Sequence, residues 1–306
     1  MINFFEKMMF EPRWYHYILI LVLMPLSIVY GLLMFFRRLL IKKRSFNIPI
    51  VSIGNLIVGG SGKTPFVITL ASRYDDVTVI SRGYGRKSRG LVEVSRNGVL
   101  LCSVKQSGDE AMLMALSLSN ASVIVSEDRK KAIALAKERG STLILLDDGF
   151  NRMEIEKFEI ILEPEKIKNY LPFPSGAFRE FWFMNKYANI VAKENIEFTR
   201  EVSFENLTDR MVLLTAISNP QRLDKYLPEK NIVKKVYLED HAYFDEEFIE
   251  KLFIENRATS ILCTSKDMVK MKNFKFNISE MKLKLCINNS IFEKVDKYIM
   301  GKHIFN

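Results

Sequence analysis

The stretch GNLIVGGSGKTP, residues 54–65, combines glycines, a lysine and a threonine in a pattern that holds nucleotide phosphates. Glycines let backbone amides point inward and approach phosphate oxygens, and a helix N-terminus adds positive potential. Lys63 can reach the β- and γ-phosphates, and the Thr64 hydroxyl can bind magnesium. The sequence therefore predicts an ATP-binding loop that comprises Gly59, Gly60, Ser61, Gly62, Lys63, Thr64 and Pro65.

The stretch departs from the strict phosphate-loop pattern at one position. The pattern places glycine at position 57, where this chain has Ile57. The departure keeps the amides, the lysine and the hydroxyl in their expected context between a strand and a helix. The alternative is a tight turn with an incidental Lys-Thr pair. If the loop binds ATP, Lys63 has a catalytic role, because phosphoryl transfer depends mostly on positioning and charge neutralisation.

Two acidic pairs lie where an α/β fold places ligands. Asp147 and Asp148 end the run TLILLDD, at the carboxyl edge of a predicted parallel strand. A carboxylate there can hold the magnesium ion of a nucleotide. Asp109 and Glu110 open a helix in SGDEA, and a carboxylate near the γ-phosphate can accept a proton from an attacking hydroxyl. Turn or helix capping is the alternative for both pairs.

Of the three histidines, only His241 is placed for catalysis. His16 lies at the edge of an apolar segment, and His303 is close to the C-terminus. His241 follows a predicted strand in LEDHAYF, where Asp240 can orient or charge its ring. A lone His-Asp pair is more often structural, so the residues alone leave both roles open.

The basic and aromatic stretch SRGYGRKSRG, residues 81–90, also follows a predicted strand. Arg82, Tyr84 and Arg86 in this stretch can grip an anionic substrate, and a solvated loop is the alternative.

Apolar β-rich runs alternate with helical patterns from Asn47 onward. Strands this apolar, separated by helices, predict a mostly parallel sheet covered on both faces. Asn97-Gly98 between two alternating runs predicts a hairpin over 90–101. The predicted strands are 48–53, 77–81, 122–126, 142–148 and 158–163, and the predicted helices are 65–74, 109–118 and 128–140.

A second alternating set begins near Met211 and predicts a smaller α/β unit. The segment 165–210 before it contains the irregular loop LPFPSGAFRE and two runs that we interpret as extended connectors. We therefore predict the α/β class with two domains, 46–195 and 196–306, behind an N-terminal segment, 1–45. In the second set the predicted strands are 211–218, 232–240, 260–265 and 282–287, and the predicted helices are 219–228, 245–257 and 290–300.

The N-terminal segment contains an uncharged, almost wholly apolar stretch of 20 residues, 17–36. This is about the length that crosses a hydrocarbon core of roughly 30 Å. The stretch predicts a membrane-anchoring helix, with a buried core helix or a hairpin bent at Pro25 as alternatives. The basic cluster that follows it predicts that the remaining chain lies in the cytoplasm. This cluster consists of Arg37, Arg38, Lys42, Lys43 and Arg44.

Composition narrows the class of protein. The chain has 306 residues, of which 48% are hydrophobic and 26% charged, as in a globular protein. The net charge is +9, but five of these positive charges belong to the basic cluster after the apolar stretch, so we expect no nucleic-acid partner. Cys102, Cys263 and Cys286 show no metal-ligand or disulfide spacing, which favours a reducing compartment.

Seven stretches, taken in order, resemble the tetraacyldisaccharide 4'-kinase family, the lipid A 4'-kinases. The resemblance implies two α/β/α sandwich domains, a P-loop NTPase-like N-terminal domain and a smaller C-terminal one, with the active site in the cleft between them. It also implies transfer of the γ-phosphoryl group of ATP to the 4'-hydroxyl of a tetraacyl glucosamine disaccharide 1-phosphate. The location implied is the cytoplasmic face of the inner membrane of a Gram-negative bacterium. The stretches are GNLIVGGSGKTP, SRGYGR, GDEAMLMA, DDGFNR, PSGAFRE, DHAYF and TSKD.

The resemblance also implies roles for single residues. Asp109 is similar to the family's proton-accepting aspartate, and His241 to its partner from the second domain. ATP and Mg²⁺ are the implied cofactors, and the bilayer and an acylated glucosamine disaccharide phosphate are the implied partners. The metal-side residues are Thr64, Glu110, Asp147 and Asp148, and the substrate-side residues are Arg82, Tyr84, Arg86, Asn151 and Arg179.

The chain departs from the family pattern at two motifs. The family usually has DDGFQH, where this chain has Asn151 and Arg152 at the last two positions, and DHH, where this chain has Ala242 last. An asparagine keeps the amide at shorter reach, whereas arginine for histidine changes the charge. A membrane-tethered P-loop ATPase that acts as a switch on protein partners is the alternative function, because it needs the same phosphate-binding residues.

Overall fold

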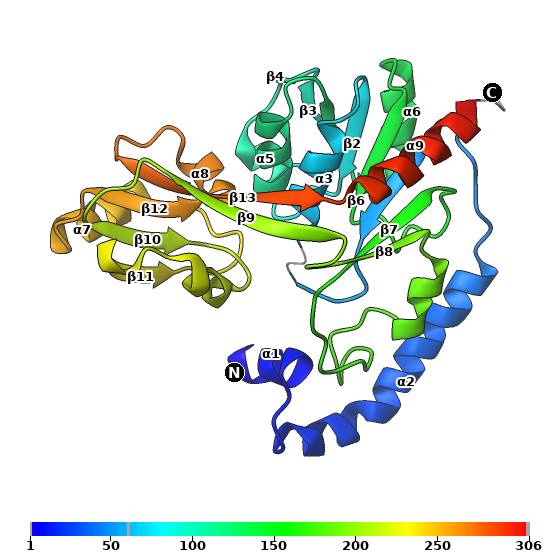
Figure 1. The fold of residues 1–306 in the computed structure, drawn as a ribbon, viewed down its shortest axis with the longest axis horizontal. Helices are drawn as coiled ribbons and strands as arrows, with labels where there is room; N and C mark the ends of the chain where they lie inside the picture. The colour runs from blue at the N-terminus through cyan, green and yellow to red at the C-terminus, as the bar shows by residue number, and fades with distance from the viewer. Residues whose placement is uncertain (1, 60–61, 304–306) are drawn as a thin grey trace. The chain divides into compact units, whose positions relative to one another are not determined.

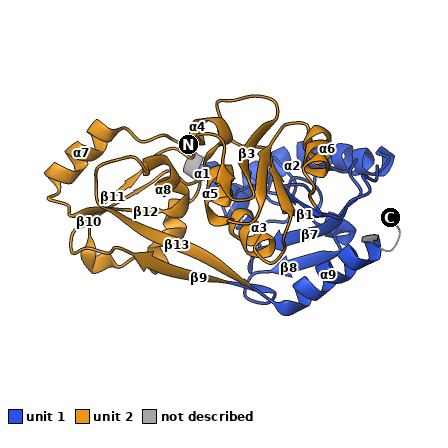
Figure 2. Cartoon of the chain, turned by 90° about the horizontal axis from the view of Figure 1, so that it is seen from above, with its two compact units in different colours: residues 1–63, 142–199, 287–306 blue, residues 64–141, 200–286 orange. Residues whose placement is uncertain are grey.

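The computed structural model describes residues 2–59 and 62–303, and the chain divides into two compact units (Figure 1, Figure 2). Unit 1 comprises residues 1–63, 142–199 and 287–306, and unit 2 comprises residues 64–141 and 200–286. Each unit is therefore assembled from segments that are far apart in the sequence. Gly60 and Ser61 of the predicted phosphate loop lie outside the described residues.

Unit 1 contains four parallel strands, two of which are wholly buried. Its strand order is β6 (Leu143–Asp147), β1 (Ile50–Gly54), β7 (Phe158–Glu163) and β8 (Ile190–Lys193). All residues of β1 and β6 are buried, which explains why both strands are apolar without alternation. Because β1 and β6 run in the same direction, with Ile53 opposite Asp147, their carboxyl ends meet at one edge of the sheet.

The N-terminal part of unit 1 is helical. Helix α1 (Ile2–Phe10) precedes the 25-residue helix α2 (His16–Leu40), which by length and composition could cross a membrane. Side chains such as Val22 and Leu33 are about two-thirds exposed, at 70% and 64%. One face of α2 therefore packs on the rest of unit 1, and the other face exposes apolar side chains to the surroundings of the protein. The buried residues of α2 are His16, Ile20, Ser27 and Gly31.

Unit 1 is completed by a 3₁₀ helix, η1 (Trp182–Tyr187), and by the last helix, α9 (Asn289–His303). On α9 the Tyr298 hydroxyl accepts a hydrogen bond from the amide of Ile50, at 3.4 Å, and its ring lies 5.1 Å from that of Phe158. These contacts hold the C-terminal helix on strands β1 and β7.

The first part of unit 2 carries a second group of strands. Here β2 (Val77–Ser81) and β5 (Ser122–Val125) are parallel, while β3 (Val92–Arg96) is antiparallel to β5 and to β4 (Val99–Leu100). The β3–β4 turn is Asn97-Gly98, and both residues have positive φ, as a two-residue hairpin of type I′ requires. The helices are α3 (Lys63–Ala71), α4 (Val104–Ser107), α5 (Asp109–Ser117) and α6 (Arg129–Glu138).

The second part of unit 2 is a five-stranded sheet in which the first four strands are parallel. Helix α8 packs against α5 of the first part, so the start of α5 lies beside residues from the second half of the chain. The strand order is β11 (Ile232–Tyr237), β10 (Met211–Thr215), β12 (Ser260–Thr264), β13 (Ile278–Ile287) and β9 (Phe198–Glu205). The helical elements are η2 (Pro220–Tyr226), η3 (Glu229–Asn231), α7 (Glu246–Glu255) and α8 (Ser265–Met271).

Most elements expected from periodicity are confirmed, two expectations are corrected, and one further helix is found. The helix predicted over 219–228 is the 3₁₀ helix η2, and it ends at Tyr226 because Leu227, which precedes Pro228, is extended. The two runs interpreted as connectors are strands β8 and β9. Helix α8, seven residues long, was not predicted. The residue limits of the two predicted domains stay a prediction.

The β3–β4 hairpin gives a test of the turn. A Cβ atom at Gly98 would lie 2.1 Å from the carbonyl oxygen of Ser119, whereas one at Gly140, which has a similar φ, would meet nothing within 4 Å. We expect Gly140→Ala to lower the free energy of unfolding by about 1–2 kcal/mol, the cost of a left-handed backbone. Gly98→Ala should cost more because it adds a clash with backbone. Urea unfolding measures both, and equal losses would contradict the close approach at Gly98.

Candidate active site

The described part of the predicted phosphate loop has backbone that requires glycine. Gly59 and Gly62 have φ values of 97° and 83°, which other residues adopt only with strain. Helix α3 begins directly afterwards, at Lys63. The departure from the strict pattern has a packing reason, because the Ile57 side chain lies in a buried apolar cluster with Phe178. Glycine at position 57 would leave a gap in this cluster.

Lys63 is held by two residues of unit 1. Its ammonium donates to Asn55 Oδ1 at 2.9 Å and lies 3.4 Å from Asp148 Oδ1. Asn55 follows β1 and is 2% exposed. The lysine therefore stands on the carboxyl end of β1, where a parallel sheet places ligands.

Asp148 is also bound by Arg179. Nη1 of Arg179 donates to both carboxylate oxygens, at 3.1 and 3.0 Å. Burial alone would raise the pKa of Asp148, but the charges of Lys63 and Arg179 hold it below the usual value. The Asp148 backbone has φ 53°, a costly conformation for a residue other than glycine. The neighbouring Asp147 is 4% exposed at the end of β6.

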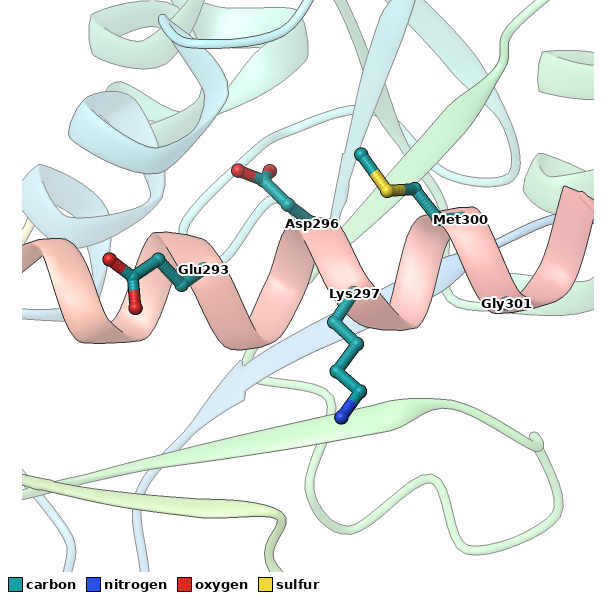
Figure 3. Close-up of a pocket in the computed structure, with 5 residues that line it drawn as sticks. All are labelled: Glu293, Asp296, Lys297, Met300 and Gly301. Carbon is teal, nitrogen blue, oxygen red and sulfur yellow. The ribbon is translucent and has the colours of Figure 1, made fainter.

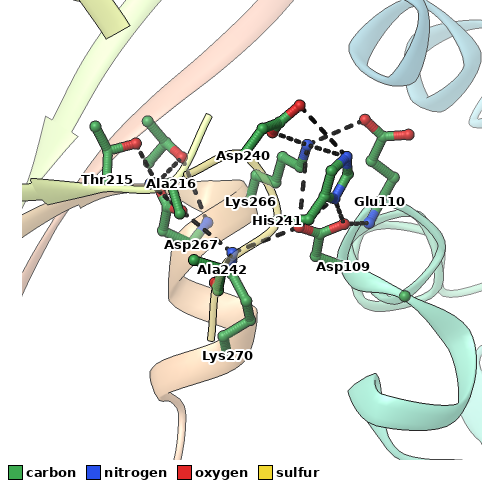
Figure 4. A network of polar contacts seen from close by, with 12 residues as sticks. Asp109, Glu110, Thr215, Ala216, Asp240, His241, Ala242, Lys266, Asp267 and Lys270 are labelled. Atoms are coloured by element: carbon green, nitrogen blue, oxygen red, sulfur yellow. Dashed lines mark hydrogen bonds and ion pairs between the residues drawn. The ribbon is translucent and has the colours of Figure 1, made fainter. Parts of the chain in front are cut away.

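The second group of predicted residues lies in unit 2, where Asp109 and His241 form a close pair (Figure 4). His241 Nδ1 lies 2.9 and 3.0 Å from the two oxygens of Asp109. Asp109 is 4% exposed, at the start of α5. An ionised carboxylate only accepts hydrogen bonds, so Nδ1 of His241 carries the proton of this bond. Like Asp148, His241 has a left-handed backbone, with φ 63°.

Two lysines of α8 surround this pair (Figure 4). Lys270 Nζ lies 3.5 Å from Asp109 Oδ2, and its side chain is 1% exposed. Lys266 Nζ is 3.9 Å from the same oxygen and 3.4 Å from Nε2 of His241. Burial alone would raise the pKa of Asp109, but the hydrogen bond from His241 and the two lysines lower it. The cluster therefore keeps a buried carboxylate ionised.

Lys266 also forms ion pairs with two further acids, Glu110 and Asp240. Its ammonium lies 3.2 Å from Glu110 Oε1 and 3.4 Å from Asp240 Oδ1. Burial alone would lower the pKa of Lys266, but these acids and Asp109 raise it. Glu110 and Asp240 thus share one cation.

Helix α8 is fixed in place by the fully buried Asp267. Its carboxylate accepts hydrogen bonds from the Thr215 hydroxyl at 2.6 Å and from the amide of Ala216 at 3.0 Å. A further bond comes from the hydroxyl of Thr264, the N-cap residue of α8, at 2.7 Å. Asp267 therefore ties the helix that carries both lysines to strand β10.

The stretch 81–90 contacts the Asp109–His241 pair through two of its residues. The Tyr84 ring lies 5.0 Å from that of His241, and a Cβ atom at Gly85 would lie 3.3 Å from the same ring. Arg86, by contrast, is 3% exposed in its side chain and binds Glu127 and the carbonyl of Gly90. Arg86 thus orders the loop, while Arg82 and Tyr84 are exposed.

The predicted site residues fall into the two units. Unit 1 contains Lys63, Asp147, Asp148, the exposed Asn151 and Arg179, and unit 2 contains the half-buried Thr64 and Pro65 together with Arg82, Tyr84, Arg86, Asp109, Glu110 and His241. Joint action of the two sets on one substrate stays a prediction.

A hollow lies along α9, away from the predicted site residues in the sequence. It is lined by Glu293, Asp296, Lys297, Met300 and Gly301, all from one helix (Figure 3). Its side chains have mixed charge and include none of the predicted site residues. The phosphate loop and the Asp109–His241 pair remain the better candidates.

Comparison with known proteins decides the family. The family described as tetraacyldisaccharide-1-P 4'-kinase matches residues 19–208 and 192–300. The tetraacyldisaccharide 4'-kinase of Helicobacter pylori strain J99 is 48% identical over 97% of this chain and 95% of its own length. The chain belongs to the tetraacyldisaccharide 4'-kinase family.

Other members of the 4'-kinase family are similar over nearly their whole length. The Aliarcobacter butzleri enzyme is 45% identical over 96% of each chain. A crystal structure of LpxK from Aquifex aeolicus, described as an "apo" form in complex with ATP, superposes with a TM-score of 0.77. It is 27% identical and covers 92% of this chain and 99% of its own. The α/β fold class predicted from the sequence is thereby confirmed.

Sequence reasoning missed several residues of the candidate site. Lys266 and Lys270 are four residues apart, which places them on one face of a helix, but 265–271 was not recognised as a helix. Asn55 belongs to the glycine-rich stretch 54–65, but the sequence pattern indicates no role for it. Its contact with Lys63 depends on the turn after β1, which no local pattern reveals.

The lysines give a test of the charge balance at Asp109. Replacing Lys270 with methionine removes a buried cation 3.5 Å from the carboxylate, so the pKa of Asp109 should rise. The acid limb of the pH–rate profile should then move to higher pH. Lys251→Met, at an exposed site on α7, is the control and should leave the limb in place. An unmoved limb in Lys270→Met would contradict the stabilising role of Lys270.

Proposed function

We propose that this protein transfers the γ-phosphoryl group of ATP to the 4'-hydroxyl of a tetraacyl glucosamine disaccharide 1-phosphate. This is a late step of lipid A biosynthesis and forms lipid IVA. The single observation that carries the chemistry is the buried Asp109 carboxylate, which His241 and two lysines keep ionised. Family membership supplies the acceptor, because the relatives are named for this reaction.

In the proposed reaction Asp109 accepts the proton of the sugar hydroxyl. The hydroxyl oxygen forms a bond to the γ-phosphorus, the bond to the β–γ bridging oxygen breaks, and ADP leaves. An ionised carboxylate in a site with few water contacts suits this task, since it accepts hydrogen bonds and keeps its lone pairs available. His241 would position the carboxylate through the hydrogen bond that Nδ1 donates to it.

Lys63 and the phosphate loop bind ATP in this proposal. The related LpxK structure is described as a complex with ATP, which supports ATP as the donor. In the present structure Asn55 and Asp148 hold the Lys63 ammonium at the carboxyl end of β1. ATP would exchange these partners for its β- and γ-phosphates. Arg179, beside Asp148, and the exposed Arg82, Tyr84 and Asn151 are the proposed contacts to substrate, whereas Arg86 would act by shaping the loop.

Magnesium fits the same residues as a nucleotide-bound ion. Among residues 2–59 and 62–303, no group of three or more His, Cys, Asp or Glu side chains forms a metal cage. Mg²⁺ usually binds through one or two carboxylates, substrate phosphates and water, so it does not require such a cage. Thr64, Asp147, Asp148 and Glu110 are the proposed oxygen donors. When bound, the ion neutralises charge on the transferring phosphates.

We also infer that α2 lies in the membrane interface, with the catalytic residues on the cytoplasmic side of the inner membrane of a Gram-negative bacterium. The helix contacts unit 1 from Ile20 to Gly31 through its buried face and exposes apolar side chains on the opposite face. A helix that packs on the protein along one face and exposes apolar side chains on the other can bury the exposed face in a bilayer. Such an anchor would confine the enzyme and its lipid substrate to one surface.

Labelled ATP tests the proposed function directly. The protein would be incubated with γ-³²P-ATP, Mg²⁺ and a monophosphorylated tetraacyl disaccharide in detergent micelles. We expect label in the glycolipid, at the 4'-position. Label in free phosphate alone would contradict the kinase and favour the ATPase switch.

Two substitutions separate chemistry from ATP positioning. Asp109→Asn keeps the shape but removes the proton acceptor, so kcat should fall about 100-fold or more with ATP binding little changed. Lys63→Ala should lower turnover about 100- to 1000-fold, because the positive charge that would stabilise the phosphates is lost. Steady-state kinetics and ATP-analogue binding measure both. If Asp109→Asn weakened only ATP affinity, Asp109 would be a metal or structural residue.

A further inference from the structure

The segment 172–181, which contains the predicted substrate contact Arg179, is bonded to the stretch that leads into the phosphate loop. The carbonyl of Ala177 accepts a hydrogen bond from the amide of Val58 at 2.9 Å. The amide of Arg179 donates to the carbonyl of Leu56 at 2.7 Å. Movement of this segment would therefore move the residues just before Gly59.

The same segment is bonded on its other side to helix α2. The amide of Ser175 donates to Ser27 Oγ at 2.8 Å, and the Ser175 hydroxyl donates to the carbonyl of Ile20 at 3.1 Å. Gly31 allows the Phe181 ring to approach closely, since a Cβ atom there would lie 2.5 Å from Cζ of the ring. The segment thus lies between the proposed membrane helix and the approach to the phosphate loop.

Arg38, in the last turn of α2, makes the strongest of these contacts. It belongs to the basic cluster expected beside the membrane, yet its side chain is 8% exposed, while its neighbour Arg37 is exposed. Nε and Nη2 of Arg38 donate to the two oxygens of Glu180, at 3.0 and 2.7 Å. Nη2 also donates to the carbonyl of Phe150 at 3.3 Å, and the guanidinium lies 4.2 Å from the centre of the Phe150 ring.

The two partners of Arg38 are chain neighbours of the catalytic-site residues. Glu180 follows Arg179, and Phe150 lies two residues after Asp148. Arg179 and Asp148 are themselves bonded to each other, and Asp148 is an ion-pair partner of Lys63. A single guanidinium therefore binds the side chain that follows Arg179 and the backbone shortly after Asp148.

This geometry favours a positioning role over a purely stabilising one. A buried ion pair contributes little net stability, because the loss of hydration offsets much of the attraction. A two-bond fork between guanidinium and carboxylate instead fixes distance and orientation.

We propose that Arg38 is a positioning residue for phosphoryl transfer. Its contacts with Glu180 and Phe150 fix Arg179 and Asp148, and through them Lys63, to the helix that lies in the membrane. The inference rests on the proposed kinase function. Of the two arginines in the last turn of α2, Arg38 then serves the active site and Arg37 faces the lipid headgroups.

The test compares Arg38→Met with Arg37→Met in zwitterionic detergent micelles, where attraction to anionic lipid plays no part. Small displacements of catalytic groups cost up to about 100-fold in rate, so we expect kcat of Arg38→Met to fall by roughly 10- to 100-fold. Arg37→Met should stay within about twofold of wild type. Binding of a non-hydrolysable ATP analogue and the melting temperature show whether Arg38→Met is folded. A folded Arg38→Met with wild-type kcat would overturn the proposal.

Arg38→Lys covers the case in which the methionine variant does not fold. Lysine keeps the positive charge but has no planar fork, so a lowered kcat in a folded Arg38→Lys supports positioning by the fork. A wild-type kcat in this variant would contradict it.

A double-mutant cycle tests whether Arg38 acts through Glu180. If it does, Arg38→Met combined with Glu180→Gln should be little slower than Arg38→Met alone. Multiplied losses would mean independent effects and would contradict the coupling. Wild-type protein in the same assay separates the two proposals, because failure of wild type to label the glycolipid counts against the kinase function itself.

Discussion

A carboxylate can remain ionised away from water only when cations and hydrogen-bond donors are buried with it. At Asp109 the donor is His241, and the cations are Lys266 and Lys270, both from a helix of the second half of the chain. Desolvation alone would neutralise the acid and remove its use as a proton acceptor. In unit 2, the position of helix α8 brings these cations to Asp109. The buried Asp267 ties α8 to β10, and packing of α8 on α5 brings the lysines to the carboxylate.

Unit 1 has a similar arrangement of charges around the half-buried Asp148. Its parallel strands β1 and β6 bring Lys63 and Asp148 to one edge, and Arg179 supplies the second cation. The left-handed backbone at Asp148 is tolerated because these bonds over-determine it. In both units the acid is held by cations from segments that are remote in sequence, so the arrangement depends on the tertiary fold.

The sequence predicted well whatever depended on local pattern. Apolar runs located the buried strands, Asn97-Gly98 located the hairpin, and the glycines located a turn that leads into α3. It failed where long-range contacts decide. Helix α8 is short and weakly patterned, so its lysines escaped notice. Arg38 looked like one more residue of a basic cluster, and only the fold reveals its buried fork with Glu180, which lies 142 positions away.

The most direct measurement is the pKa of Asp109 in the intact protein. Carboxyl-¹³C-aspartate labelling, with Asp109→Asn to assign the signal, follows its ionisation by NMR as pH falls. We expect a midpoint below the ordinary aspartate value of about 3.9, and we expect the stability that Asp109 contributes to be lost only as pH falls below that value. A midpoint above the ordinary value would mean that burial outweighs the cations, and Asp109 could not be the ionised proton acceptor that the account requires.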